Sequence, residues 1–79
     1  MYIDSDLEID RSRHAGRYLL SVKKGKKAQR INRALGNPYD CVIQSDEEAI
    51  FVVNPTALLV ALLAAGKSKT WARQFTASL

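Results

Sequence analysis

The sequence contains only one cysteine and one histidine, and this scarcity excludes several kinds of site. Cys41 has no second cysteine with which to form an intramolecular disulfide. With His14 as the only histidine, a zinc site built from the usual nitrogen and sulfur ligands is not expected. We therefore predict a protein that holds no metal and no cofactor.

Long apolar runs are also missing. The longest one, Ala57–Ala65, has nine residues, whereas a membrane-spanning helix needs about 20. The first ten residues are acidic and contain no apolar run of the kind that marks a secretory signal. We expect a cytoplasmic protein that does not cross a membrane.

Each of the first two segments of the chain lacks one sign of charge. The first ten residues contain four acids and no base, and residues 11–33 contain nine bases and no acid. The bases are Arg11, Arg13, Arg17, Lys23, Lys24, Lys26, Lys27, Arg30 and Arg33. Segregated charge creates a local field that a mixed surface would cancel, and this field favours an anionic partner. The pattern points to a binding protein.

The length of 79 residues predicts a single domain. A chain of this size buries only about 60% of the surface that it exposes when unfolded. Because neither a disulfide nor a metal is expected, association with another chain is the remaining way to add stability. We therefore predict a homodimer, formed through the apolar helix described next.

Two helices are predicted near the C-terminus. Asn54 is a good N-cap, Pro55 is favoured at the first helical position, and Gly66 suits the residue after a helix. The helix between them is apolar around most of its circumference, which is typical of a helix in a core or between subunits. Ser68 can cap a second, short helix, and its apolar residues at a spacing of four share one face. These residues are Trp71, Phe75 and Leu79.

The middle of the chain predicts a basic helix followed by a β-hairpin. Lys26–Leu35 reads as a helix that ends at Gly36. Tyr39–Gln44 and Ala49–Val53 are rich in β-branched and aromatic residues and are typical of strands, joined by the polar turn Ser45–Glu48. The fold class is therefore α+β, with a basic helix, a two- or three-stranded antiparallel β-hairpin sheet, an apolar helix and a short C-terminal helix.

Residues 1–23 allow two interpretations. Tyr18, Leu20 and Val22 alternate with less apolar positions, which favours a strand over residues 17–23. A helical face is also possible, at the cost of a glycine at position 16 inside the helix, about 1 kcal/mol. We predict the strand. Residues 1–16 form an N-terminal segment that could be partly disordered, and residues 17–79 form the compact domain.

No motif predicts catalysis. Gly66-Lys67-Ser68 has the last three residues of a phosphate-binding loop, but position 61 is alanine instead of the required glycine, and a helix precedes the triplet. A helix end followed by a helix cap explains the three residues. His14 and Cys41 show no sign of the proximity that a catalytic pair needs. We therefore predict that the protein is not an enzyme.

The basic helix is the strongest functional signal. Its charged residues fall outside its apolar face, at spacings that place like charges side by side. Such a surface suits DNA or RNA phosphates, or an acidic protein surface. Gln29 and Asn32 could contact base edges. The predicted nucleic-acid-binding residues are Lys23, Lys24, Lys26, Lys27, Arg30 and Arg33.

The order of elements resembles that of the Phd/YefM-type antitoxins, from about residue 20 to residue 79. Ser21–Leu35, with the sequence SVKKGKKAQRINRAL, is similar to the start of these proteins, and the hairpin followed by Asn54-Pro55 continues the similarity. The resemblance implies a dimeric DNA-binding repressor whose C-terminal segment wraps a toxin. Trp71, Phe75 and Leu79 would then contact the protein partner.

The same order also resembles small phage-encoded inhibitors, including some anti-CRISPR proteins. This alternative implies a protein that blocks a nucleic-acid-handling complex by direct binding. Its contacts would come from acidic side chains that occupy a positively charged channel. The residues predicted for this role are Asp46, Glu47 and Glu48 in the hairpin turn, with the acidic N-terminus as a second route.

Overall fold

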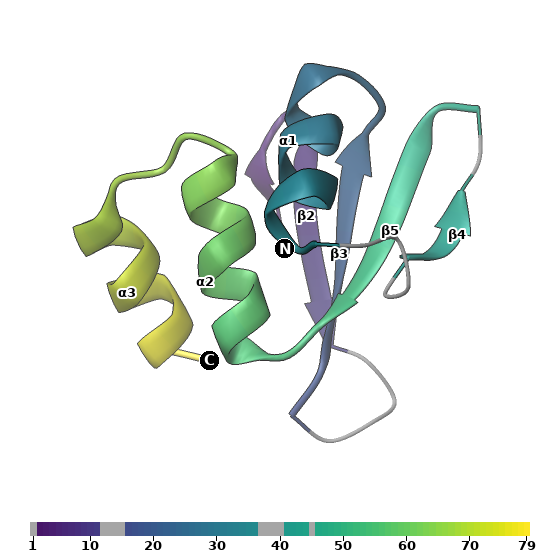
Figure 1. Ribbon diagram of the computed structural model, residues 1–79. Coiled ribbons are helices and arrows are strands. Elements are labelled where there is room, and N and C mark those ends of the chain that lie inside the picture. The colour runs from purple at the N-terminus through teal and green to yellow at the C-terminus, as the bar shows by residue number, and fades with distance from the viewer. Residues whose placement is uncertain (1, 12–15, 37–40, 45) are drawn as a thin grey trace.

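The computed structural model describes residues 2–11, 16–36, 41–44 and 46–79, in which it forms five strands and three helices (Figure 1). The strands are β1 Tyr2–Asp4, β2 Leu7–Arg11, β3 Tyr18–Lys23, β4 Cys41–Gln44 and β5 Glu48–Val53. The helices are α1 Lys26–Ala34, α2 Pro55–Ala64 and α3 Lys69–Ala77. The predicted α+β class is confirmed, and so is the order of basic helix, hairpin, apolar helix and C-terminal helix.

The five strands form one antiparallel sheet in the order β1-β2-β3-β5-β4. The predicted number of strands, two or three, was therefore too low. The central strand β3 is the one predicted over residues 17–23, so the strand interpretation of that segment is confirmed. Helix α1 connects β3 to β4, and the hairpin then returns along β5 to pair with β3.

The N-terminal segment contributes two strands that the sequence analysis did not predict. In β2 the apolar Leu7 and Ile9 alternate with Glu8 and Asp10, and Leu7 and Ile9 are almost completely buried. They lie opposite Val22 and Leu20 of β3, so their side chains face the same side of the sheet as the buried residues of that strand. Residues 2–11 are therefore part of the domain.

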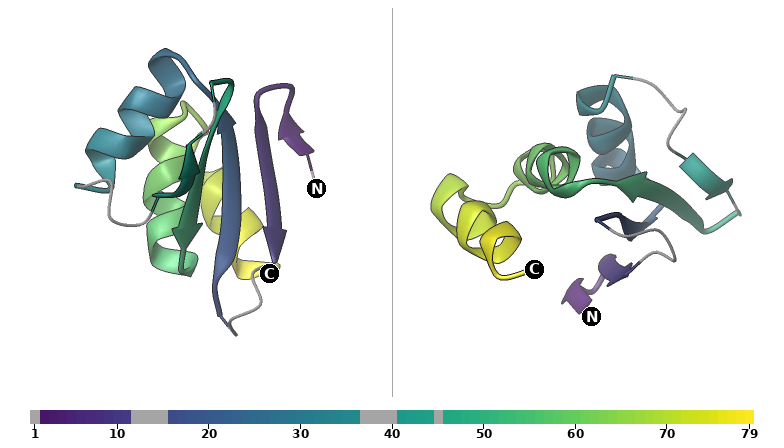
Figure 2. Two further views of the ribbon diagram at one scale, coloured as in Figure 1. Left: turned by 90° about the vertical axis from the view of Figure 1, so that its right-hand side faces the viewer. Right: turned by 90° about the horizontal axis from the view of Figure 1, so that it is seen from below.

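One face of the sheet forms the core, and the three helices lie on that side of it (Figures 1 and 2). The core combines alternate residues of β2, β3 and β5 with the inner faces of the helices. Its buried members are Leu7, Ile9, Leu20, Val22, Ala28, Ile31, Ala49, Phe51, Val53, Leu58, Ala61, Leu62 and Ala72. Because every one of them is apolar, the hydrophobic effect stabilises this packing without buried charges that would need partners.

Both ends of α2 have the capping interactions that the sequence predicts. At its start the backbone N–H of Ala57 donates to Oδ1 of Asn54 at 2.7 Å. At its end Gly66 has a φ of 96°, and the backbone N–H of Lys67 donates to the carbonyl of Leu62 at 3.1 Å. This is the arrangement in which a left-handed residue terminates a helix and satisfies its last carbonyls.

The hairpin of β4 and β5 lies where the sequence places it, with small differences. Strand β4 begins at Cys41, and positions 39 and 40 of the predicted strand lie outside the described residues. Glu48, expected in the turn, is the first residue of β5. His14 also lies outside the described residues. Among the described residues, no helix is long and apolar enough to cross a membrane.

Candidate nucleic-acid interface

Helix α1 presents a row of exposed cations on the side opposite the core. Ala28 and Ile31 are buried, and this sets the rotation of α1 about its own axis relative to the core. Lys26, Arg30 and Arg33 follow one another at spacings of four and three, so they line up along the solvent side. Within the described part of the chain, no acidic side chain forms an ion pair with any of the three. These three residues are called the basic stripe below.

Lys23 and Lys24 lie beside the acidic hairpin turn instead. Lys23 of β3 lies opposite Glu48 of β5 in the strand register. The backbone N–H of Lys24 donates to the carbonyl of Glu47 at 2.9 Å. Together with Asp46, these side chains line one shallow surface depression. The two lysines are exposed, but the carboxylates next to them reduce the positive potential there.

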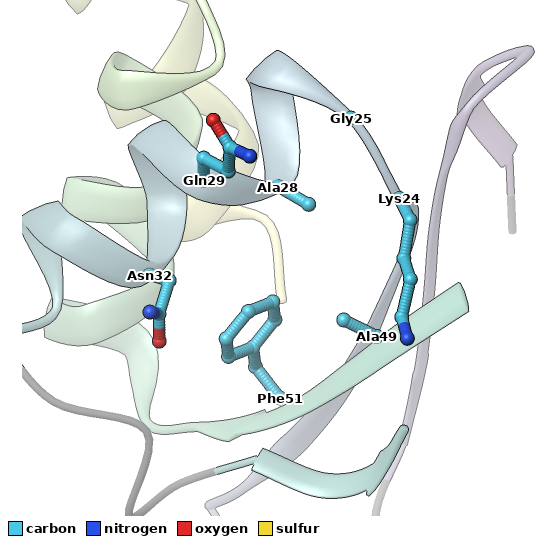
Figure 3. Close-up of a pocket in the computed structure, with 7 residues that line it drawn as sticks. All are labelled: Lys24, Gly25, Ala28, Gln29, Asn32, Ala49 and Phe51. Carbon is cyan, nitrogen blue, oxygen red and sulfur yellow. The ribbon is translucent and has the colours of Figure 1, made fainter. Parts of the chain in front are cut away.

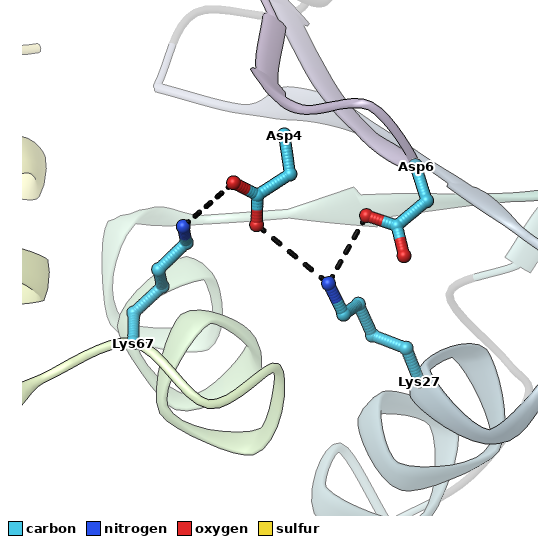
Figure 4. Close-up of polar contacts among 4 residues, drawn as sticks. All are labelled: Asp4, Asp6, Lys27 and Lys67. Atoms are coloured by element: carbon cyan, nitrogen blue, oxygen red, sulfur yellow. Dashed lines mark hydrogen bonds and ion pairs between the residues drawn. The ribbon is translucent and has the colours of Figure 1, made fainter.

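Lys27 is directed toward the acidic turn between β1 and β2 (Figure 4). Its Nζ lies 3.0 Å from Oδ1 of Asp6 and 3.6 Å from Oδ2 of Asp4. Lys67, in the α2–α3 turn, reaches the same place, with its Nζ 2.8 Å from Oδ1 of Asp4. These four side chains are called the Asp4 cluster below. Each is about one-quarter to one-third exposed.

The Asp4 cluster changes the acid–base behaviour of its central carboxylate. The hydrogen bond from Lys67 and the positive charges of Lys67 and Lys27 lower the pKa of Asp4 below its ordinary value of 3.8, against the opposing effect of partial burial. The carboxylate of Asp4 therefore stays ionised to a lower pH than that of an ordinary aspartate.

The six predicted phosphate-binding residues therefore fall into three settings. Lys26, Arg30 and Arg33 form the basic stripe, Lys23 and Lys24 adjoin the acidic hairpin turn, and Lys27 belongs to the Asp4 cluster. Two backbone hydrogen bonds connect Lys23 and Lys24 to the acidic turns: the N–H of Lys23 donates to the carbonyl of Asp6 at 3.0 Å, and the N–H of Lys24 donates to the carbonyl of Glu47. Charges that are segregated along the sequence are therefore neighbours in the fold.

The predicted partner-binding aromatics are only partly available to a partner. Trp71 and Phe75 stack, with ring centroids 5.1 Å apart and an interplanar angle of 11°. Phe75 and Leu79 are half-buried against the core, whereas Trp71 is 37% exposed. The Nζ of Lys67 lies 5.2 Å from the centroid of the Trp71 ring, which is cation–π distance.

Two exposed apolar side chains on α2 extend the possible protein-binding surface. Val60 is 36% exposed and Leu63 is 40% exposed. The sequence predicts that α2 lies in a core or between subunits, but it does not indicate these two positions. A helix that is apolar on all sides carries no sequence signal for which side faces solvent. The observed packing of α2 against α1 and α3 leaves this side uncovered.

A cleft lies between α1 and β5, with a volume of about 200 Å³ (Figure 3). Its apolar lining comes from Ala28, Ala49 and Phe51, and the side chains of Gln29 and Asn32 stand along α1 at its edge. Pockets for drug-sized ligands usually measure about 300–1,000 Å³. This cleft could accept only a small apolar group, next to the two amides that the sequence analysis considered for contacts with base edges.

The described residues contain no group of three or more His, Cys, Asp or Glu side chains that could hold a metal ion. The Gly66-Lys67-Ser68 triplet has the structural role that the sequence analysis gave it. Gly66 ends α2, and Oγ of Ser68 accepts a hydrogen bond from the backbone N–H of Trp71 at the start of α3, at 3.2 Å.

Comparison with known protein families, with curated proteins and with solved structures found no match to this chain. The functional interpretation therefore depends on the geometry and charge of the surfaces described above.

Proposed function

We propose that the protein is a small, non-enzymatic nucleic-acid-binding protein of the repressor or antitoxin type, which contacts phosphates through α1. The basic stripe is the observation that supports this function best. Lys26, Arg30 and Arg33 are exposed on one side of a helix whose other side is held in the core. A rigid row of cations can follow a phosphate backbone, and each neutralised phosphate releases counterions.

The number of contacts that we propose is smaller than the six residues of the sequence-based prediction. Lys27 already has carboxylate partners, and Lys23 and Lys24 adjoin the acidic turn. Three phosphate contacts correspond to a slope of about −2.7 for the logarithm of the binding constant against the logarithm of salt concentration on duplex DNA. A dimer that binds with both copies would double the contacts, and the slope would then be about −5.4.

Binding of a fluorescently labelled duplex, followed by anisotropy between 50 and 200 mM salt (roughly the range over which such contacts weaken), tests this function. Arg30→Gln and Arg33→Gln should each make the slope less steep by about 0.9 for each bound copy, which is about 1.8 for a dimer. Arg73→Gln removes the same charge from an exposed position on α3 and is the matched control. No binding at the lowest salt concentration, or an equal effect of Arg73→Gln, would refute the proposal.

The second candidate is a protein inhibitor that binds through its acidic turn. It is favoured by the exposure of Asp46, Glu47 and Glu48 together at one end of the sheet. Such a cluster could enter a positively charged channel of a nucleic-acid-handling complex. Asp46→Asn combined with Glu47→Gln and Glu48→Gln should then abolish inhibition of the nucleic-acid-handling complex, while circular dichroism shows an intact fold. Unchanged inhibition would eliminate this route.

A further inference from the structure

The two lysines of the Asp4 cluster come from distant parts of the chain and meet at one carboxylate. Lys27 is in the first turn of α1, and Lys67 is in the turn between α2 and α3. Oδ1 of Asp4 is 2.8 Å from Nζ of Lys67, and Oδ2 is 3.6 Å from Nζ of Lys27 (Figure 4). Asp4 thus has one ammonium group near each of its oxygens, and Nζ of Lys27 also lies 3.0 Å from Oδ1 of Asp6.

Two ammonium groups that converge in this way can also bind an oxyanion with two free oxygens. A phosphate group also presents neighbouring oxygens with shared negative charge, and lysine ammonium groups bind phosphate as point charges. The side chains of both lysines are about one-quarter exposed, so solutes can reach them. The contact between Lys67 and the Trp71 ring helps to position one of the two ammonium groups.

We propose that Lys27 and Lys67 form a phosphate-binding site that the protein's own Asp4 occupies in the absence of ligand. The natural occupant would be a phosphate of the nucleic acid bound along α1, so this inference rests on the proposed function. Lys27 lies three residues before Arg30 on α1, so the site is next to the basic stripe at Arg30. Asp4, with Asp6 beside it, acts as an internal competitor that weakens binding to nucleic acid.

Displacement of Asp4 is feasible because its contacts are on the surface. Ion pairs between partly exposed side chains contribute little to stability. A tethered group competes with an effective concentration in the millimolar range. Free phosphate must exceed that level, whereas a phosphate of a nucleic acid already held by the basic stripe is itself at a high local concentration. The site therefore discriminates between a polyanion and a small anion.

Inorganic phosphate, titrated at constant ionic strength, tests the site without nucleic acid. Trp71 is the only tryptophan of the chain and contacts Lys67, so its fluorescence should report an anion at this place. Asp4→Asn should show a saturable change in Trp71 emission at a phosphate concentration at least tenfold lower than the wild type. Asp4→Asn combined with Lys67→Met should show none.

Glu8→Gln is the matched control, because it removes the same charge from the same hairpin. Glu8 lies opposite Ser21 and alternates with the buried Leu7 and Ile9, on the sheet face away from the helices. Equal responses of Glu8→Gln and Asp4→Asn, or no response of Asp4→Asn, would overturn the proposal. If Asp4→Asn does not fold, the wild type should still respond at high phosphate, and Lys27→Met should remove that response. A wild type that never responds overturns the proposal too.

An oligonucleotide titration separates this inference from the proposed function. Asp4→Asn should make the salt slope steeper by about 0.9 for each bound copy, since Lys67 loses its carboxylate partner while Lys27 keeps Asp6, and Glu8→Gln should leave the slope unchanged. A phosphate response without any oligonucleotide binding would refute the function and keep the site. Oligonucleotide binding with an unchanged slope and no phosphate response would refute the site and keep the function.

Discussion

Asp4 and Lys67 are 63 positions apart in the sequence, and their side chains are joined by a contact of 2.8 Å. This contact ties the N-terminal strand to the turn between α2 and α3. With Lys27 as the second partner of Asp4, it also connects both to the start of α1. The acidic N-terminal segment thus neutralises part of the positive charge that the sequence predicts for nucleic-acid binding, because Lys27 is one of the predicted phosphate contacts.

The stability contributed by Asp4 should depend on pH in the acid range only. The pKa of Asp4 is lower in the folded protein than its ordinary value of 3.8. A lowered pKa means that the stabilisation is fully present above the ordinary value and is lost as the pH falls through the folded value. In urea unfolding, Asp4→Asn should therefore be slightly less stable than the wild type at pH 6, and the difference should shrink as the pH falls below 3.8.

Lys67→Met provides the control for that experiment. Without Lys67 the largest cause of the lowered pKa is gone, so adding Asp4→Asn to Lys67→Met should change stability much less than it does in the wild type. A difference between wild type and Asp4→Asn that persists undiminished at the lowest pH would show that the loss does not come from the charge of Asp4.

Core packing against α1 should be far more sensitive to substitution than the solvent side of the same helix. Ile31 is completely buried, whereas Gln29 is exposed. Ile31→Ala should reduce the free energy of unfolding by about 2–5 kcal/mol through lost burial and a residual cavity. Gln29→Ala should change it by about 0.5 kcal/mol at most. Urea unfolding measures both, and similar losses would contradict the observed orientation of α1.

The start of α2 should depend on the side chain of Asn54. Asn54→Ala removes the acceptor for the backbone N–H of Ala57, and loss of such a cap costs about 0.5–2 kcal/mol. Asn54→Asp keeps a side-chain oxygen at the same position and should retain most of the stability. Thermal unfolding followed by circular dichroism distinguishes the variants. If Asn54→Ala and Asn54→Asp destabilise the protein equally, the hydrogen bond to the side chain of residue 54 does not stabilise the start of α2.

The sequence predicted most accurately those elements whose signals are local. Asn54 and Gly66 mark the two ends of α2 because capping depends on residues within one turn. The strand β2 was not predicted, because only Leu7 and Ile9 mark its alternation and its place in the sheet depends on pairing with β3. The Asp4 cluster could not be predicted for a different reason. Its residues are brought together only by the packing of β1, α1 and the α2–α3 turn, and no local sequence pattern encodes that arrangement.

The exposed side of α2 should mediate self-association. Val60 and Leu63 are apolar and more than one-third exposed on a helix with no charged residue, and burying them against a second copy would remove apolar surface from water. A stable interface needs about 800 Å² from each partner, so neighbouring side chains must take part as well. Sedimentation at micromolar concentration should show a dimer, and Leu63→Glu should convert it to a folded monomer.

Gln74→Glu introduces the same charge on the exposed side of α3 and is the matched control for Leu63→Glu. Because a glutamate buried in an apolar interface loses its hydration without gaining a partner, only the substitution inside the interface should dissociate the dimer. Dissociation by Gln74→Glu to the same extent would assign the effect to overall charge. A wild type that sediments as a monomer at micromolar concentration would remove α2 as a dimer interface and leave each copy with three phosphate contacts.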